Sequence, residues 1–430
     1  MIKLKIDELI KISIIFLIFV SYFAGFNLRE NLAGGAEEDF LQFTWPALKG
    51  LENNLSYSLL NYGTFHEGSW PMFHLLNAFL NPFTYSELAF QLSITIISIL
   101  NVFLFQRIIV KKYNLSFIDA FFISSILLLL PFFRSSAFWG LTENFGWLFL
   151  LLSINIYITI PAKTQKLSIN IILKIFLTSL FSALALYTRQ YLVFFSAFVV
   201  ISSLLDKKFN HFILYVIFFS ILSIPSLVLI KIWGGLADTK NFDSDWFGDR
   251  HSPLNIIKNI PIFFSYFLFY LFPFLFIQDK FFSTTKEIKE KSIIFILCFL
   301  VFMIIYLVGY FDYLKEITLG GGVFIKLNKL LFGDNLIFFL FISSLGLTFI
   351  ISSVRLYPKN IVILVTLLIY CIPQYFFQEY VEPLILLIFL FLMKNKYNFF
   401  EKDVKNYTLY FVQIYFISNL AFTYFYRNLL

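Results

Sequence analysis

Long apolar runs, separated by short polar stretches, dominate the pattern of hydrophobic and polar positions along this chain. Runs of about 17–25 apolar residues are long enough to cross a lipid bilayer as α-helices, and about thirteen such runs can be counted. The pattern predicts an all-α, polytopic bundle of about 11–13 transmembrane helices, forming one domain over residues 1–430. The expected spans lie near residues 9–26, 86–110, 117–133, 138–160, 169–187, 191–205, 211–232, 259–277, 292–310, 335–354, 360–377, 381–393 and 407–426.

The composition agrees with lipid as the solvent of this chain. Hydrophobic residues make up 59% of the 430 positions, phenylalanine alone occurs 61 times, and the mean hydropathy is +0.81. Cys298 and Cys371 both lie in apolar runs, so they offer neither a disulfide framework nor a paired-cysteine metal site. The four histidines show no spacing that is typical of metal ligands.

The basic residues predict the orientation of the bundle. When Lys3, Lys5 and Lys11 are placed in the cytoplasm, most of the 33 Lys and Arg residues fall in cytoplasmic loops. This bias explains the net charge of +7, so we expect lipid rather than nucleic acid as a partner. Most of the 26 acids, and the two largest polar loops at 27–85 and 234–258, lie on the opposite face, which we expect to be the working face.

Three adjacent carboxylates, Glu37, Glu38 and Asp39, stand in the first extracytoplasmic loop, in the stretch GGAEEDFLQFTWPALKG. Their mutual repulsion must be relieved by water, a cation or a basic group, and one of them can then have a raised pKa and act as a general base. The cluster could also hold a divalent cation; no other cofactor is indicated. The alternative interpretation is a solvated loop whose acids begin a helix.

Further polar side chains lie near the predicted outer ends of spans. Arg189 and Gln190 stand in ALYTRQYLVFF, where an arginine either snorkels to the interface or binds an anion such as a lipid phosphate. Glu143 lies in FWGLTENFGW, and Glu379 and Glu382 lie in CIPQYFFQEYVEPLILL. A buried carboxylate near the bilayer indicates a functional site.

Two loop stretches have open interpretations. In DSDWFGDRHSPLN, five residues could form a polar, metal-assisted site or a solvated loop with local salt bridges: Asp243, Asp245, Asp249, Arg250 and His251. The stretch SWPMFHLLNAFLNPF is too short and too interrupted by proline to span the membrane. It predicts an interfacial or re-entrant helix, in which Trp70 suits an aromatic belt.

The order of these motifs resembles that of the GT-C class of membrane glycosyltransferases. It is most similar to the eukaryotic α-1,2-glucosyltransferases that add the last glucose to the dolichol-linked oligosaccharide. That family has an Asp-Glu pair and a His in its first loop, a Pro-containing apolar segment, an Arg-Gln pair ending a span, a loop with Gly-Gly and Gly-Asp-Arg, and a C-terminal Pro-Gln followed by Glu. The matching positions, which cover nearly the whole chain, are Glu38 and Asp39 with Gln42, WPMFHLLNAFL, Arg189 and Gln190, Gly234 and Gly235 with Gly248, Asp249 and Arg250, and PQYFFQEY from Pro373 to Tyr380.

The resemblance implies a GT-C-like fold and an inverting hexosyltransferase that uses a polyprenyl-phosphate sugar as donor and a glycan or lipid-linked molecule as acceptor. It implies that a first-loop carboxylate removes the acceptor proton and that Arg189, with Arg250, stabilises the leaving phosphate. The acid pair is reversed here and Gln42 replaces the family's histidine, which leaves the base open between Glu38 and Asp39.

Two other classes of function remain as alternatives. A surface-polysaccharide polymerase or ligase also uses polyprenyl carriers, but generally works through basic residues in outer loops. A polyprenyl-linked glycan flippase or transporter would have broken helices at the midplane and ionisable residues deep within spans. We expect a multi-pass protein of a bacterial inner membrane, with a cytoplasmic N-terminus and an extracytoplasmic site.

Overall fold

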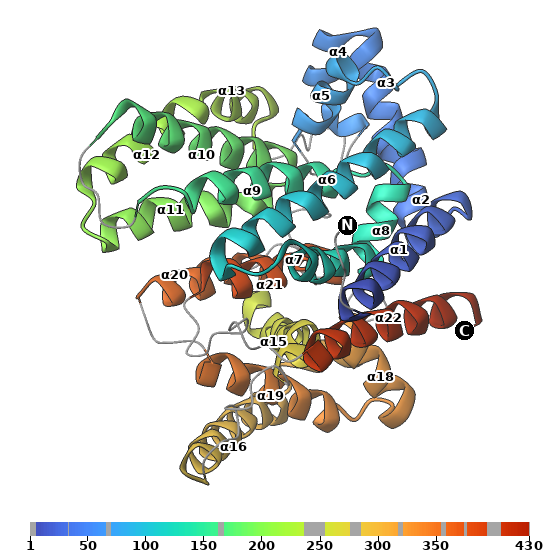
Figure 1. The fold of residues 1–430 in the computed structure, drawn as a ribbon, viewed down its shortest axis with the longest axis vertical. Helices are drawn as coiled ribbons and strands as arrows, with labels where there is room; N and C mark the ends of the chain where they lie inside the picture. The colour runs from blue at the N-terminus through green and yellow to red at the C-terminus, as the bar shows by residue number, and fades with distance from the viewer. Residues whose placement is uncertain are drawn as a thin grey trace. The chain divides into compact units, whose positions relative to one another are not determined.

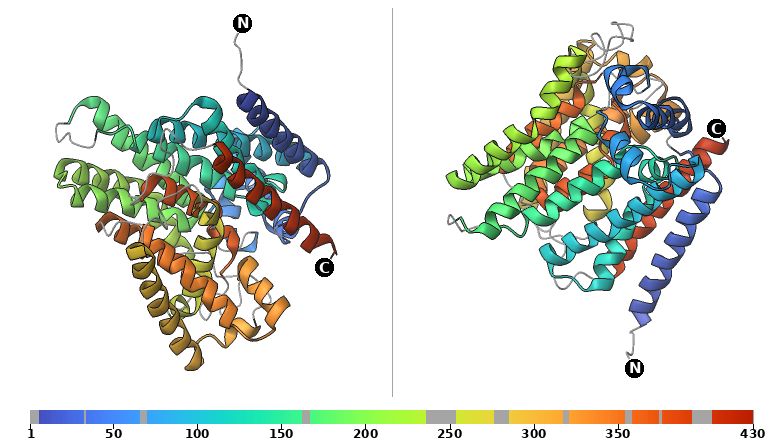
Figure 2. Two further views of the ribbon diagram at one scale, coloured as in Figure 1. Left: turned by 60° about the horizontal axis from the view of Figure 1, so that its bottom comes forward. Right: turned by 90° about the horizontal axis from the view of Figure 1, so that it is seen from above.

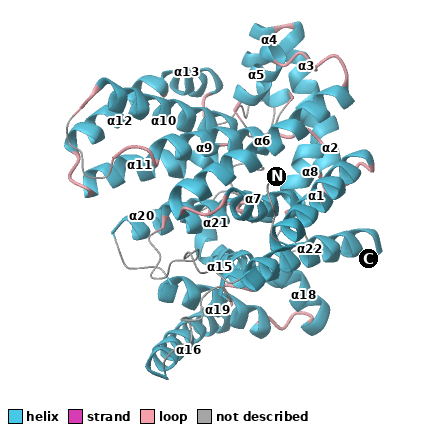
Figure 3. Cartoon of the chain, in the orientation of Figure 1, coloured by secondary structure: helices cyan, strands magenta, loops and turns pink. Residues whose placement is uncertain are grey.

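Helices form the regular structure of the described part of this chain. The computed structural model describes residues 6–32, 34–65, 70–161, 167–235, 254–275, 285–316, 321–353, 358–373, 376–393 and 406–429. No strand occurs among these residues, so the predicted all-α class is confirmed (Figure 3). Six described helices are long and apolar enough to cross a membrane, and a bent pair of helices makes a seventh if it counts as one span. The chain is therefore a polytopic membrane protein.

The number of continuous spans in the described part of the chain is smaller than the sequence predicts. Several apolar runs form short or bent helices instead of full spans. The clearest case is the run near 117–138, which bends by 71° because Leu130 adopts an extended backbone before Pro131. The six candidates outside the bent pair are Ile6–Asn27, Glu87–Tyr113, Ile169–Thr188, Phe209–Trp233, Leu254–Phe274 and Glu287–Leu307. The shorter apolar helices are Gln190–Leu205, Ile337–Ser352 and Pro358–Leu367.

Two compact units make up the chain. Unit 1 comprises Met1–Ser244 with Phe416–Leu430, and unit 2 comprises Asp245–Tyr415. The prediction of one functional domain over residues 1–430 stays a prediction.

Unit 1 contains the N-terminal helices and the end of the last one (Figure 1). Its helices are α1 (Ile6–Asn27), α2 (Ala36–Asp39), α3 (Trp45–Asn53), α4 (Leu55–Leu60), α5 (Met72–Leu80), α6 (Glu87–Tyr113), α7 (Phe117–Ser124), α8 (Pro131–Phe138), α9 (Glu143–Tyr157), α10 (Ile169–Thr188), α11 (Val193–Leu205), α12 (Phe209–Leu222), α13 (Ile224–Trp233) and the later part of α22 (Asn406–Leu429). Serine side chains cap α6, α7 and α10 by accepting a backbone N–H of the first turn, which begins these helices.

Helices α6, α9, α10 and α12 of unit 1 pack side by side (Figure 1). Polar side chains join them within an otherwise apolar core. Ser153 Oγ on α9 donates to the carbonyl of Thr178 on α10 at 2.7 Å, and Asn155 Nδ2 donates to the carbonyl of Leu104 on α6 at 3.0 Å. Such bonds suit packing in lipid, where the hydrophobic effect does not drive one helix against another.

The first loop folds into short helices that pack on α10 and α13. Its core is an aromatic cluster in which Tyr62 stacks on Trp233 at 5.9 Å and Trp70 lies 5.3 Å from Tyr187. Trp70 is only 5% exposed, so it belongs to this core and not to an aromatic belt. The predicted interfacial segment is α5, which has nine residues and does not span.

Unit 2 contains α15 (Leu254–Leu275), α16 (Thr285–Leu307), α17 (Tyr313–Glu316), α18 (Gly322–Phe332), α19 (Ile337–Ser353), α20 (Pro358–Leu367), α21 (Leu384–Leu387) and the first part of α22. The span expected at 381–393 consists of α21 and a π-helical turn, Ile388–Leu392. Figure 2 gives two further views of these helices.

A polar stripe on α15 fixes the irregular backbone that follows α20. Backbone carbonyls outside a helix need donors when water is excluded, and α15 supplies them from side chains on one face. Asn255 Nδ2 donates to Ile372 O at 3.0 Å, Asn259 Nδ2 to Cys371 O at 3.0 Å and Pro373 O at 2.6 Å, and Tyr266 Oη to Phe376 O at 3.1 Å.

Candidate functional site

The acidic triplet lies at the start of a continuous helical segment, residues 36–53, in the first loop. α2 carries Glu37, Glu38 and Asp39 in its first turn, and all three are exposed. A π-helical turn, Phe40–Thr44, follows at once and leads into α3. Acids at the beginning of a helix are favoured by the helix dipole, so the sequence places them where the fold tolerates their charge. π-turns inside helices are frequent at functional sites.

Phe40, the residue after Asp39, anchors this helical segment. Its side chain is fully buried and contacts the rings of Trp45 at 5.8 Å, Phe90 at 6.2 Å and Trp139 at 6.5 Å. These rings come from α3, from α6 and from the turn after α8. The aromatic contacts therefore fix the position of Asp39 against the helical core of unit 1.

Partial burial and two nearby charged groups determine the environment of the Asp39 carboxylate. Protein atoms surround much of its carboxylate although solvent reaches it, and this partial loss of hydration raises the pKa of Asp39 above its usual range. The Arg189 cation lowers the pKa of Asp39, and the Glu38 carboxylate raises it. Asp39 and Arg189 therefore lie within electrostatic reach of each other, although the helices from α3 to α10 lie between them in the chain.

Arg189 is held at the point where α10 stops. Its backbone is extended, with φ −143° and ψ 114°, and the chain resumes as a 3-10 turn that begins with the half-buried Gln190. A methyl group on Gly146 of α9 would lie 3.0 Å from Leu192 Cδ1 and at an ordinary contact distance of 3.6 Å from Arg189 Cγ, so α9 packs closely against the turn that carries Arg189.

An ion pair joins Arg189 Nη2 to Glu143 Oε1 at the first residue of α9. The Glu143 side chain is 7% exposed and that of Arg189 is 20% exposed. Two atoms of this pair, Glu143 Oε2 and Arg189 Nε, are buried without a hydrogen-bond partner among the described residues. Most buried polar atoms in native proteins have a partner, so these two mark a place where a bound molecule can complete the hydrogen bonding.

Amide side chains fix the corner that positions Glu143. Asn144 Nδ2 donates to Ser136 Oγ at 2.8 Å, which ties the start of α9 to α8. Asn101 Nδ2 on α6 donates to the carbonyl of Asn144 at 2.9 Å. Helices α6 and α8 thus fix the start of α9, where Glu143 stands.

Four other predicted site residues are not among the described residues of unit 1. Asp249, Arg250 and His251 lie outside the described residues. Glu379 belongs to unit 2, in the 3-10 turn Gln378–Tyr380. Its neighbour Gln378 donates from Nε2 to the hydroxyl of Tyr270 on α15, and the place of Glu379 at an outer end of a span stays a prediction.

A second buried ion pair in unit 1, between Arg134 and Glu30, was not predicted from the sequence. Arg134 Nε and Nη2 contact the two carboxylate oxygens of Glu30 at 2.7 and 2.8 Å, and Arg134 Nη1 donates to Leu128 O at 3.0 Å. Arg134 is 1% exposed and lies next to the 71° bend. The sequence feature that could have indicated this pair is an arginine between two apolar runs, in the stretch PFFRSS.

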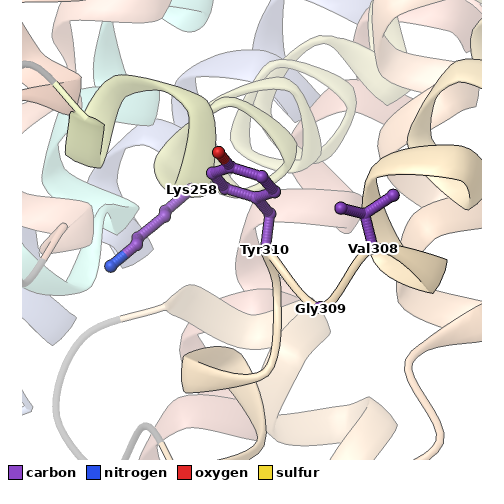
Figure 4. A pocket seen from close by; sticks show the side chains of 4 residues that line it. All are labelled: Lys258, Val308, Gly309 and Tyr310. Carbon is purple, nitrogen blue, oxygen red and sulfur yellow. The ribbon is translucent and has the colours of Figure 1, made fainter.

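Two other features of the described residues bear on ligands. No group of three or more His, Cys, Asp or Glu side chains among them is arranged to hold a metal ion. A hollow of about 270 Å³ in unit 2 is lined by Lys258, Val308, Gly309 and Tyr310 (Figure 4). Val308 and Tyr310 are 67% and 47% exposed, so this hollow is open to the surroundings and contains no carboxylate.

Comparison with family models, with curated proteins and with solved structures finds no match to this chain. The membrane architecture is therefore shown by the helices themselves, and no family is identified.

Proposed function

We propose that this membrane protein is a glycosyltransferase that moves a hexose, glucose in the family it resembles, from a polyprenyl-phosphate donor to a glycan or lipid-linked acceptor. The reaction would take place on the extracytoplasmic face of a bacterial plasma membrane, with the N-terminus in the cytoplasm. The proposal combines the resemblance of the sequence motifs with the geometry of unit 1.

One observation carries the proposal: a carboxylate with a raised pKa, Asp39, lies within electrostatic reach of Arg189, which pairs with Glu143. A base and a cation in one site are what a glycosyl transfer from a phosphate requires. The base takes the proton of the attacking hydroxyl, and the cation stabilises the charge on the departing phosphate.

The reaction would proceed as one displacement. The acceptor oxygen forms a bond to the anomeric carbon while the bond from that carbon to the phosphate oxygen breaks, which inverts the anomeric centre. Asp39 receives the hydroxyl proton, a contribution of about 10²–10⁴-fold in rate for a general base. The bonding electrons leave with the polyprenyl phosphate, whose charge Arg189 stabilises.

The unpartnered atoms of the ion pair support a sugar phosphate as the ligand. Arg189 Nε is a donor and suits a phosphate oxygen, whereas Glu143 Oε2 is an acceptor and suits a sugar hydroxyl. A molecule that carries both groups side by side would satisfy both atoms. The predicted substrate contacts of Gln190, Asp249, Arg250, His251 and Glu379, and of a divalent cation, stay predictions.

The test is to incubate the purified protein with a panel of polyprenyl-phosphate hexoses and a lipid-linked glycan extract, and to measure released polyprenyl phosphate. We expect release from one donor in the panel, and loss of that release in Asp39→Asn. Lys231→Ala, which removes an exposed cation at the end of α13, is the matched control. No release from any donor would contradict the proposal.

A transporter of lipid-linked glycans is the second candidate, and unit 2 provides the observation that favours it. Buried Glu382 accepts a hydrogen bond from Tyr270 on α15, beside the irregular segment that follows α20. Interrupted helices with buried acids are typical of transporters. A transporter would move the glycan across sealed vesicles without releasing polyprenyl phosphate, and a polymerase or ligase would consume carriers that bear a glycan chain instead of a single hexose.

A further inference from the structure

The last helix of the chain ends beside the first loop, and a glycine makes this possible. Gly34 has a left-handed backbone with φ +85°. A methyl group at Gly34 would overlap the guanidinium of Arg427, with Nη1, Nη2 and Cζ nearly equally close to it. Equal closeness of these three atoms means that the guanidinium plane lies across the glycine. Both views of Figure 2 show the C-terminal end of α22 on the side of unit 1 where α1 ends.

The same short loop is held at its other end by α8 and the turn that follows. Arg134 contacts the Glu30 carboxylate, and Trp139 Nε1 donates to the Glu30 carbonyl at 3.2 Å. Between these anchors, Gly34 N–H donates to Asn31 O at 3.2 Å. The loop from Glu30 to Gly34 is therefore fixed at both ends before α2 begins.

We propose that Arg427 is a positioning residue for the acidic triplet. By lying flat on Gly34, it fixes the loop five residues before Asp39 and so holds that carboxylate within reach of Arg189. The planar fork of arginine is needed for this contact, since a lysine has the same charge but no plane to lay across the glycine. Glycine is needed because a Cβ would occupy the same space.

This inference rests on the proposed function only for its effect on activity, so its first test does not use activity. The full-length protein in lipid nanodiscs is compared with Arg427→Ala, Arg427→Lys and the control Lys231→Ala by hydrogen exchange of residues 28–40. We expect exchange of this segment to become faster by about tenfold in Arg427→Ala and Arg427→Lys, as for local opening of a loop that has lost an anchor. Lys231→Ala should exchange as the parent does.

A pair of variants tests whether the contact itself is responsible. Gly34→Ala should disturb the loop more than Arg427→Ala, because it adds an overlap and strains a positive φ. Removing the arginine as well, in Gly34→Ala with Arg427→Ala, relieves the overlap, so the double variant should exchange no faster than Gly34→Ala alone. Independent, additive effects would overturn the proposal, as would unchanged exchange in Arg427→Ala or full protection in Arg427→Lys.

The second readout is transfer. If Arg427 positions Asp39, kcat should fall by about 10²-fold in Arg427→Ala, the size expected for a small misplacement of a reacting group, while the donor KM stays unchanged. An exchange effect without any transfer activity in the parent would leave the positioning inference standing and contradict the proposed function. A changed donor KM with normal kcat would instead make Arg427 a donor-binding residue and contradict positioning.

Discussion

Glu143 and Arg189 form an ion pair between the first residue of α9 and the residue at which α10 ends. The two helices run antiparallel, so the pair closes one end of the helical core of unit 1. Asp39 of the first loop lies within electrostatic reach of the same arginine. The Arg189 cation thus lies close to two carboxylates, Glu143 and Asp39, from separate parts of the chain.

The pH dependence of transfer should respond to Glu38. As the base, Asp39 must be ionised, so activity falls when the pH drops below its pKa. Glu38 raises the pKa of Asp39, and Glu38→Gln should therefore move the acid limb of the kcat/KM profile to lower pH. Arg189 lowers this pKa, so Arg189→Gln should move the same limb to higher pH. Complete loss of activity in Glu38→Gln would instead identify Glu38 as the base.

Donor binding should depend on Arg189. Arg189→Ala removes a charged hydrogen-bond donor from the phosphate, a loss of about 1.5–3 kcal/mol, or roughly 10–150-fold in kcat/KM for the donor. Steady-state kinetics with varied polyprenyl-phosphate sugar measure this change. Arg107→Ala, at the other end of α6 from the first loop, is the matched control. An unchanged KM and kcat in Arg189→Ala would remove Arg189 from the site.

The buried pair of Glu30 and Arg134 should stabilise unit 1. Arg134→Met leaves the Glu30 carboxylate buried without its partner, which should lower the free energy of unfolding by about 3–5 kcal/mol. Unfolding in detergent by denaturant measures the loss. Glu30→Gln together with Arg134→Met buries no charge and should recover part of the stability. A single variant as stable as the parent would refute the structural role of this pair.

The polar stripe of α15 should protect Cys371, whose carbonyl accepts from Asn259 and whose side chain is fully buried. In a Cys298→Ser background, Asn259→Ala should speed thiol labelling of Cys371 by about five- to tenfold, the equivalent of roughly 1–1.4 kcal/mol of lost hydrogen bonding. Ser265→Ala is the matched control, since Ser265 donates to Ile262 in its own helix. Equal labelling in both variants would contradict the role of the stripe.

Part of this structure could be predicted from sequence because local patterns determine it. Apolar runs predict α1, α6 and α10 as long helices, and the charge bias predicts the ends of α9 and α10 on one face, where Glu143 and Arg189 meet. Hydrophobicity alone could not predict that Arg134, after the bend at Pro131, would be buried, because its partner Glu30 lies 104 residues earlier in the chain.

Long-range contacts explain the other differences. Trp70 is typical of an interface in its sequence context, but the helices of the first loop pack on α10 and enclose it. Arg427 stands at the far end of the chain from Gly34, and the sequence contains no pattern that relates the two residues. Such pairs depend on how the helices pack and not on the spacing of residues.

A double-mutant cycle of Asp39→Asn and Arg189→Gln tests the central claim most directly. It compares kcat/KM for transfer from a polyprenyl-phosphate hexose in the parent, both single variants and the double variant. If the carboxylate and the cation act in one reaction centre, the double variant should be little slower than the slower single variant, because residues that act as a unit are not additive. Losses that multiply would show that the two residues act independently, and would contradict a shared site.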